Sequence, residues 1–440
     1  MLLKIRILKI AFKYKNYPKK LFTLQNFWRK ISSSKIIFTW DFYMKNHNLY
    51  KAKFAFTTLL ILANIHNSHN ANADSNINFY GILDYGIAYK TNYNFQANNS
   101  TNSTHNSKHN FAINSNQRNG SRLGIKANEV INNNLSLFFT LERGLYLDTG
   151  KDFAGFNRQS LLGLNINKKH NIYGGLVYTP YYNIIYQFDP FEDGTIGNYR
   201  NLKGDYLQIA DTNLPLNNDL RNVRNPVRAN NALYYSFQNK TDYFDYNFDV
   251  LYTNKLLNKT DYENSNYKLF NFALMLKQDN KYKVAFSYFL SKSNGYKSEK
   301  INQQTKLKLE NYTLGFNYNI TENLILNSYF SLDKIHFPYL QIQQKNTILI
   351  KNALLGFTLK TNNFGVFKLS YQNSFTNNKN IKNTQQFAIG NDYYINKRFL
   401  IYSAFSYIKN NDNRFATISD ALNSGNNYQK AFQTGITYFF

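Results

Sequence analysis

Cysteine is absent from this chain of 440 residues, which excludes disulfide bonds as a source of stability. Long apolar runs are absent too, since no stretch reaches the roughly 18 to 20 apolar residues that a membrane-spanning helix needs. The mean hydropathy of −0.52 is also too polar for a helical membrane protein. Acidic residues are scarce, 26 against 52 lysines and arginines, so the formal net charge is +26. These features exclude a helical membrane protein and a fold held by disulfides.

The longest stretch dominated by apolar residues, 54–65, has the length of a signal-peptide core. Three lysines precede it as a positively charged region. Small residues at Ala71 and Ala73 follow it at the spacing of a cleavage site. We therefore predict export, with cleavage after Ala73 and a mature chain that starts at Asp74.

Met44 is then the expected initiator, residues 44–73 are the predicted signal peptide, and residues 1–43 are a misassigned upstream extension. The alternative is a real but unusual extension. Residues 1–73 carry 13 lysines and arginines against one acidic residue, so the predicted mature chain keeps +14 of the charge of +26. Its basic residues are scattered rather than massed on one patch, so we predict no nucleic-acid partner.

Alternation of apolar and polar residues recurs in segments of about 9 to 12 residues from Ile77 to the end of the sequence. In one of them Tyr312, Leu314, Phe316 and Tyr318 share a face opposite polar or small residues. Tilted strands of this length and pattern cross an outer membrane. A soluble β-sandwich also alternates, but residues 74–440 show strand patterns throughout without a breaking linker or a helical domain.

The connections between these segments favour a barrel, because short polar turns alternate with long polar loops. The short turns are expected at 132–134, 167–170, 239–242, 278–281, 321–323, 361–363 and 396–398. The long loops are expected near 93–119, 148–156, 179–227, 256–266, 293–306, 334–345, 375–383 and 410–427. Seven turns and eight loops connect 16 strands. We therefore predict an all-β fold, a 16-stranded antiparallel transmembrane β-barrel with both ends on the periplasmic side.

The longest loop, 179–227, contains Pro180, Pro190, Pro215 and Pro226. Proline fixes φ and so stiffens a loop. A stiff third long loop after the fifth strand could fold into the lumen and narrow it. A disordered surface loop is the alternative.

The last strand pattern places Ile436, Tyr438 and Phe440 on one face. A strand that ends on an aromatic residue is what bacterial outer-membrane barrels present to their assembly machinery. We predict that these three residues form the barrel-assembly signal. An ordinary strand that ends on phenylalanine by chance is the alternative.

Several short motifs together resemble the general Gram-negative outer-membrane porin family, and most of all its β-proteobacterial members. The motifs are FYGILD at 79–84, SRLGIK at 121–126, LERG at 141–144, FNRQ at 156–159 and RANNALY at 228–234. The resemblance spans residues 74–440. It implies a trimeric 16-stranded channel in which basic wall residues face acidic residues of an inward-folded third loop.

On this resemblance Arg122 and Arg228 match basic residues of the pore wall. The alternation of apolar and polar residues also predicts this position for Arg122. Leu123 is expected to face lipid, so Arg122 and Lys126 are expected to face the lumen. A charged side chain in a water-filled lumen avoids the penalty of several kcal/mol that it would meet facing lipid. We therefore expect Arg122, Lys126 and Arg228 to form the basic side of the constriction.

The acidic side of the constriction is expected from Asp189, Glu192 and Asp193 in the long loop. The sequence departs from the family at Leu176, where the resemblance leads us to expect an arginine. The positive cluster is thinner there unless an arginine of the loop replaces it. Arg158 shares an alternation face with Leu162, so we expect it at a rim or a subunit contact.

No other chemistry is indicated. The four histidines of the mature chain have no metal-ligand spacing, and phosphate-binding loops and serine-nucleophile motifs are absent, so no metal, cofactor or enzyme activity is expected. We predict a passive outer-membrane channel for small hydrophilic solutes and ions with a mild anion preference. The expected partners are outer-membrane lipid, lipopolysaccharide, the barrel-assembly machinery and two further copies in a homotrimer. A solute-specific porin and a plugged structural or adhesive barrel are the alternatives.

Overall fold

The structure is a computed structural model. It describes residues 76–94, 108–151, 155–192, 194–203, 226–254, 267–279, 281–293, 296–298, 301–305, 308–336, 347–377, 383–411, 416–418, 423–424 and 428–440. The chain divides into two units, Met1–His69 and Asn70–Phe440, and all described residues belong to the second. The predicted extension, signal peptide and cleavage residues Ala71 and Ala73 lie outside the described residues.

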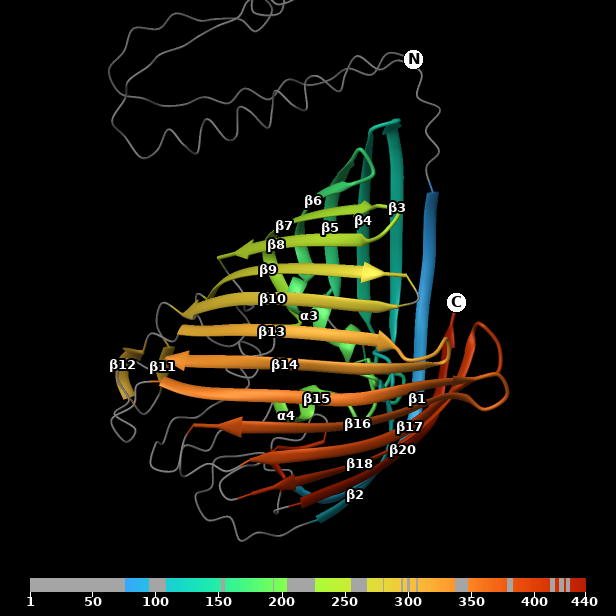
Figure 1. Cartoon of the computed structure of the whole chain (residues 1–440), viewed down its shortest axis with the longest axis vertical. Helices are drawn as coiled ribbons and strands as arrows, with labels where there is room; N and C mark the ends of the chain where they lie inside the picture. Colours follow the sequence, from blue (N-terminus) through green and yellow to red (C-terminus); the bar gives the residue numbers. More distant parts are fainter. Residues whose placement is uncertain are drawn as a thin grey trace, which may run out of the picture. The chain divides into compact units, whose positions relative to one another are not determined.

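Sixteen of the described strands form one closed antiparallel ring (Figure 1). In ring order they are β1 (Asn76–Asn94), β3 (Arg122–Asn132), β4 (Leu135–Gly144), β5 (Gln159–Ile166), β6 (His170–Tyr178), β7 (Arg228–Lys240), β8 (Asp245–Thr253), β9 (Tyr267–Gln278), β10 (Tyr282–Ser293), β13 (Lys308–Asn319), β14 (Leu324–His336), β15 (Thr347–Thr361), β16 (Gly365–Thr376), β17 (Thr384–Tyr394), β18 (Phe399–Asn410) and β20 (Tyr428–Phe439). The 16-stranded antiparallel barrel predicted from the sequence is confirmed.

The ring closes at β1, which pairs with β3 on one edge and with β20 on the other. Gly81 and Phe440 exchange backbone hydrogen bonds of 3.0 and 3.1 Å at this seam. Closure leaves no open sheet edge, which a lipid environment requires. Two short strands extend the ladder along β1, β2 (Lys108–Ser115) and β19 (Asn423–Ser424). A separate hairpin is formed by β11 (Tyr296–Ser298) and β12 (Ile301–Thr305).

Short turns and long connections alternate around the ring at the predicted places. Three of the expected loops contain strand. In the loop near 93–119, β1 continues to Asn94 and β2 returns beside it. The β11–β12 hairpin lies in the loop near 293–306, and β19 lies in the loop near 410–427. Within the described residues no helix has the length and apolarity to cross a membrane.

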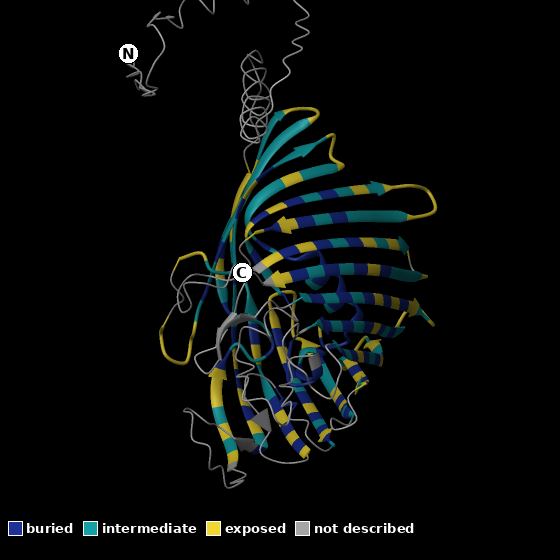
Figure 2. Ribbon diagram, turned by 90° about the vertical axis from the view of Figure 1, so that its left-hand side faces the viewer, coloured by how far each residue is buried: buried dark blue, intermediate teal, exposed yellow. Residues whose placement is uncertain are grey.

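The two faces of the strands differ in polarity, as the alternation predicts. On β13 the side chain of Leu314 is 51% exposed on the outer face, whereas Asn311 and Thr313 are buried on the inner one. The same banding runs along the neighbouring strands (Figure 2). Apolar residues facing outward and polar residues facing inward are the arrangement of a barrel with a hydrated interior in a membrane.

After β6 the chain forms a short helix, α3 (Pro180–Ile185), a 3₁₀ turn, η2 (Tyr186–Phe188), and a second short helix, α4 (Arg200–Lys203). The sequence starts α3 locally, because the Thr179 hydroxyl accepts a hydrogen bond from the backbone N–H of Tyr182 and Pro180 occupies the first turn. We call residues 179–203 the wall segment, omitting Asp193, which is not described.

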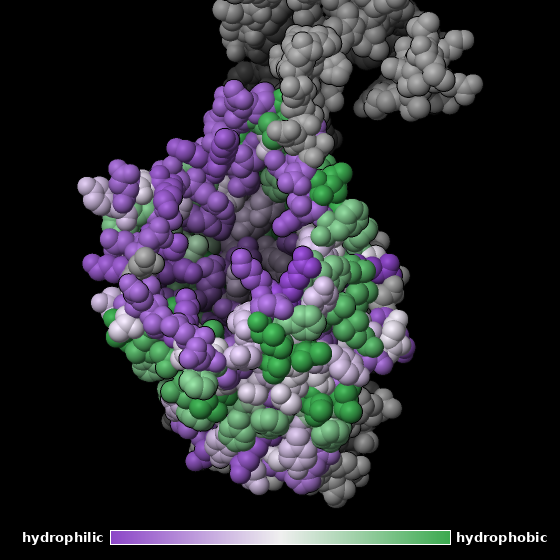
Figure 3. All heavy atoms as spheres, turned by 90° about the vertical axis from the view of Figure 1, so that its right-hand side faces the viewer, coloured by the Kyte–Doolittle hydropathy of each residue, from purple (hydrophilic) through white to green (hydrophobic). Residues whose placement is uncertain are grey.

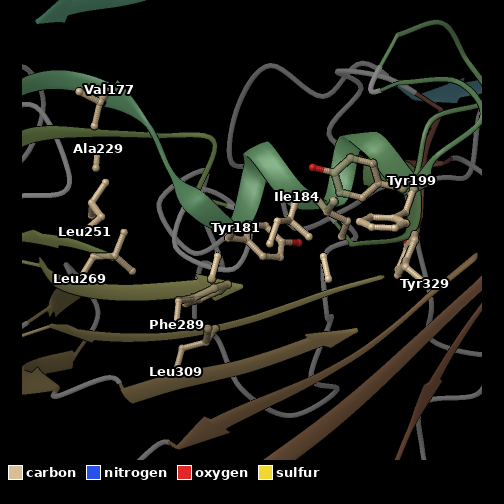
Figure 4. Packing of buried hydrophobic residues seen from close by; sticks show 14 of the residues in the cluster. Val177, Tyr181, Ile184, Tyr199, Ala229, Leu251, Leu269, Phe289, Leu309 and Tyr329 are labelled. Carbon is tan, nitrogen blue, oxygen red and sulfur yellow. The ribbon is translucent and has the colours of Figure 1, made fainter. Parts of the chain in front are cut away.

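The wall segment packs against the inward-facing side chains of the strands that follow it. Tyr181 and Ile184 of α3 lie in one apolar cluster with Phe289 of β10 (Figure 4). The backbone N–H of Tyr181 donates to the Asn271 amide oxygen of β9 at 2.7 Å. Further along, the Gln372 amide of β16 donates to the Tyr199 carbonyl at 3.0 Å. The segment is therefore fixed to the inner wall by apolar packing and by wall amides.

Three wall glycines make room for this segment. A Cβ on Gly315 would lie 2.4 Å from the Phe188 ring, and one on Gly356 would lie 2.5 Å from Pro190. A Cβ on Gly390 would lie 2.9 Å from the Phe191 ring. Carbon atoms in contact are normally about 3.5 to 4.0 Å apart, so any larger residue at these positions would displace the segment.

Candidate functional site

Three arginines gather around one tyrosine and one carboxylate at the start of the wall segment. Arg158 donates to Glu142 at 2.8 Å, and the Nε of Arg122 lies 3.5 Å from the other oxygen of the same carboxylate. Arg158 and Arg228 both donate to the Tyr178 hydroxyl, at 3.0 and 3.1 Å. We call Arg122, Arg158, Arg228, Tyr178 and Glu142 the arginine cluster. It holds three guanidinium groups against one carboxylate.

Arg158 was expected at a rim or a subunit contact because it shares an alternation face with Leu162, and this shared face is wrong. Leu162 is 57% exposed on the outer face of β5, whereas the Arg158 side chain is 16% exposed and reaches the buried Glu142. The physical reason is that Arg158 precedes β5 in a bend, so the alternation of the strand does not extend to it. The Tyr178 ring and the Glu142 carboxylate outweigh burial and raise the pKa of Arg158.

Leu176 stands where the resemblance leads us to expect an arginine. It pairs with Ser160 of β5, and the ladder between β6 and β7 is irregular around it. Arg158 brings a third guanidinium to the cluster that the resemblance would otherwise complete from position 176. The arginine cluster thus has three guanidinium groups, and one of them comes from the connection between β4 and β5 rather than from position 176 or an arginine of the long loop.

Lys126 lies on β3, the strand that begins with Arg122. Its Nζ is 5.4 Å from the centre of the Tyr80 ring, and the Tyr80 hydroxyl donates to Glu142 at 3.0 Å. Lys126 itself is exposed. The structure therefore brings the three predicted basic residues Arg122, Lys126 and Arg228 to one stretch of wall.

A second cluster links the wall segment to distant strands. Arg118, which lies between β2 and β3, donates to Glu192 of the wall segment at 2.9 Å and to Asp392 of β17 at 3.0 Å. Lys368 of β16 donates to the same Asp392 carboxylate. We call these four residues the ion network. It holds two cations against two carboxylates.

Burial separates the ion network from the arginine cluster. The side chains of Arg118, Lys368 and Asp392 are each 4–5% exposed, and only Glu192 is open, at 57%. Burial opposes the charge of Arg118, but Asp392 and Glu192 outweigh it and raise the pKa of Arg118. The surrounding protein partly desolvates the Glu192 carboxylate, which would raise its pKa, but Lys368 and Arg118 outweigh this effect, and the pKa lies below its ordinary value. Arg118 and Glu192 are thus ionised at neutral pH.

The three acidic residues predicted for the constriction, Asp189, Glu192 and Asp193, do not form one group among the described residues. Glu192 belongs to the ion network, as described above. Asp189 is 1% exposed, and its carboxylate accepts hydrogen bonds from the backbone N–H groups of Phe191 and Tyr199, each at 3.0 Å. Its charge is therefore directed at the backbone of the wall segment. Asp193 lies outside the described residues.

Residues of the predicted assembly signal lie on the outer face of β20 and at its end. Ile436 and Phe440 are 50% and 46% exposed. The Tyr438 ring packs against Phe399 of β18 in a tilted arrangement, with ring centres 4.9 Å apart, and stacks on Phe440, with ring centres 5.8 Å apart. Their role in assembly remains a prediction.

A hollow lies at the end of the barrel that carries the short turns, and hydrophilic residues border most of it (Figure 3). One cavity there measures about 710 Å³. Its polar lining includes Asn128, Asn165, Asn171, Ser236 and Gln238. In the described part of the chain no group of three histidine or acidic side chains is arranged to hold a metal ion.

The sequence model of the family described as Gram-negative porin matches residues 57–413. Among solved structures, the anion-selective porin from Comamonas acidovorans is similar, with a TM-score of 0.61 and 19% identity over 83% of this chain and 100% of its own. OmpF of Salmonella typhi, solved with daunomycin, has a TM-score of 0.53 and 15% identity over 83% of this chain and 97% of its own.

OmpT of Vibrio cholerae in its trimer form has a TM-score of 0.53 and 12% identity over 83% of this chain and 99% of its own. No curated protein matches the sequence. The family match covers most of the chain, and the solved structures share its fold. The chain therefore belongs to the Gram-negative porin family and forms a channel for the diffusion of solutes across the outer membrane.

Proposed function

We propose that this porin is a passive channel for small hydrophilic solutes and ions, narrowed where the wall segment lies opposite the arginine cluster, with a mild preference for anions. The observation that carries the proposal is the difference in charge balance between the two clusters. The arginine cluster has three cations and one carboxylate, whereas the ion network has two of each.

The balance of charged side chains along the lumen decides whether the channel prefers anions or cations. Glu192 is the exposed carboxylate of the wall segment, but Arg118 neutralises it at 2.9 Å. Asp189 is buried against backbone amides. The arginine cluster keeps uncompensated positive charge, to which Lys126 adds. A charged lining raises the local concentration of the opposite ion, so we expect anions to permeate more readily.

The test is the reversal potential of residues 74–440 refolded into a planar bilayer that separates two KCl concentrations. We expect a potential of the sign of chloride preference. The variant carrying Arg122→Gln, Arg158→Gln and Arg228→Gln should lose this preference. The matched control removes three exposed basic residues at the short turns, Lys281→Gln, Lys397→Gln and Arg398→Gln, and should keep most of it. Clear cation preference of the unmodified channel would contradict the proposal.

The two alternatives give different currents. A solute-specific porin would show saturation of the current as one solute is added. A plugged structural or adhesive barrel would fold and give no conductance. The proposal includes no catalytic activity, in keeping with a family and a fold that point to a non-enzymatic channel.

The proposal extends to a homotrimer that is inserted by the barrel-assembly machinery and surrounded by outer-membrane lipid and lipopolysaccharide. In support, the outer face carries an apolar depression of about 430 Å³ lined by Phe139, Leu141, Leu162 and Gly174. The similar OmpT of Vibrio cholerae is described in a trimer form. Conductance steps that occur in groups of three would agree with a trimer, and single steps only would contradict it.

A further inference from the structure

The helix α3 presents two different sides. Tyr181, Ile184 and Ile185 are buried against the wall. Residues 182, 183, 186 and 187 are only half-buried. A helical turn places residues i and i+4 on one side, so Tyr182 and Tyr186 follow each other along the side away from the wall.

These two tyrosines continue a column of stacked rings. The rings of Tyr178 and Tyr182 are 5.1 Å apart with an interplanar angle of 17°, and those of Tyr182 and Tyr186 are 5.6 Å apart with an angle of 24°. We call these three residues the tyrosine column. Tyr182 and Tyr186 lie outside the buried apolar cluster and are half-buried, so the edges of their rings form an aromatic surface that a planar molecule can contact.

Cations flank the column at both ends. The Arg228 guanidinium lies 4.8 Å above the centre of the Tyr178 ring, and Arg158 donates to the hydroxyl of the same tyrosine at 3.0 Å. At the far end Lys283 of β10 donates at 2.9 Å to Gln187, the residue that follows Tyr186. The column is thus a flat aromatic surface beside guanidinium groups that suit carboxylates.

The phenol of Tyr186, at the far end of the column, is neutral at physiological pH. Burial, with the nearby Glu192 and Tyr178, raises the pKa of Tyr186 above its ordinary value of 10.0. Neutral phenols repel no anion and keep their hydroxyl groups as donors. An anion at the arginine cluster can therefore lie against the rings without meeting a negative charge from them.

We propose that the tyrosine column and the arginine cluster together form a binding track for planar organic anions, namely aromatic carboxylates. The carboxylate pairs with the guanidinium groups, and the aromatic ring packs against the accessible edges of the column rings, whose faces lie against one another and against Arg228. This inference rests on the proposed open channel and names a class of solute for it. An aliphatic anion of equal charge would gain the ion pairing but less of the aromatic contact.

The experiment uses residues 74–440 in a planar bilayer, with chloride carrying the current and benzoate as the probe. Cyclohexanecarboxylate, which has the same charge and a non-aromatic ring, is the comparison anion. We expect benzoate to block part of the current at a concentration about tenfold lower than cyclohexanecarboxylate. An edge-to-face aromatic contact of about 1 to 1.5 kcal/mol corresponds to a difference of that size.

Two variants locate the block. The double variant Tyr182→Leu, Tyr186→Leu should raise the half-blocking concentration of benzoate about tenfold and leave that of cyclohexanecarboxylate nearly unchanged. Tyr182→Phe, Tyr186→Phe keeps the rings and should keep the block. The matched control Tyr288→Leu, Tyr312→Leu removes a ring pair 5.0 Å apart on the outer face and should change neither value.

Equal block by the two anions, or an unchanged benzoate block in the Tyr182→Leu, Tyr186→Leu variant, would overturn the inference. In either case the channel would still conduct, and the proposed function would stand. A folded barrel without any conductance would overturn the proposed function itself. If the leucine variant failed to fold, the comparison of the two anions in the unmodified channel would still decide.

Discussion

The arginine cluster and the ion network contain similar residues, but they differ in burial and in charge balance. In the arginine cluster the side chains of Arg122 and Arg158 are 20% and 16% exposed, and the cations outnumber the carboxylate. In the ion network Arg118, Lys368 and Asp392 are almost fully buried, and the charges balance. A buried charge is tolerated only when it is paired, whereas a charge beside water is stable when unpaired. The buried, charge-balanced ion network is thus suited to attaching the wall segment to the barrel. The arginine cluster, with its excess of positive charge, is suited to ion selectivity.

The largest effect is expected where the balance of the ion network is broken. Asp392→Asn leaves Arg118 and Lys368 buried without their shared carboxylate, which should destabilise the barrel by about 3–5 kcal/mol. Thermal unfolding followed by gel mobility would measure the loss. The double variant Asp392→Asn, Lys368→Gln restores the balance and should recover part of it. A single variant as stable as the unmodified protein would show that the network does not hold the segment.

A smaller effect is expected from the packing beside the network. Gly315→Ala places a methyl group 2.4 Å from the Phe188 ring, so the wall segment must shift, at about 1–3 kcal/mol. We expect lower thermal stability and lower single-channel conductance. Phe188→Leu in the same chain should relieve the contact. Unchanged conductance in Gly315→Ala would exclude a narrowing role for the segment at this point.

Removal of one cation from the arginine cluster should change selectivity more than stability. Arg158→Gln removes one of the two arginines beside Glu142, but Arg122 stays beside this carboxylate and so limits the loss of stability. We expect a smaller chloride preference in the reversal potential and nearly unchanged thermal unfolding. Arg158→Lys keeps the charge and should keep most of the preference. Equal selectivity in Arg158→Gln and the unmodified channel would place Arg158 outside the conducting path.

The smallest effect is expected from pH. The pKa of Glu192 is lowered in the folded protein, so its contribution is present above the ordinary value of 4.5 and is lost as pH falls through the folded pKa. Current noise from the wall segment should therefore be constant between about pH 7 and pH 5 and rise only at lower pH. Glu192→Gln should remove this dependence. A change in noise centred above pH 5 would assign it to another group.

The barrel could be predicted because its signals are local. Alternation in a strand such as β13 and the polar turns between strands depend on neighbouring residues, so the 16 strands and their connections follow from the sequence. Alternation gave the wrong face for Arg158, because β5 begins at Gln159 and the pattern does not extend to residues outside the strand.

The ion network could not be predicted in this way. Arg118 and Asp392 are 274 residues apart in sequence, and closure of the ring brings them together. Asp189 illustrates a second limit, since a loop carboxylate can face the lumen or accept from its own backbone, and composition does not distinguish the two. Arg122 and Arg228 were found because a family resemblance supplied their positions.

The wall glycines Gly315, Gly356 and Gly390 also decide how this channel responds to selection. Any change of residue at a glycine codon adds a side chain, and here each added side chain meets the wall segment. A bacterium exposed to a toxic solute that enters by this route has these codons as sites where one substitution restricts entry while the ring of strands stays paired. We expect resistant isolates selected on such a solute to carry changes there, which sequencing would reveal.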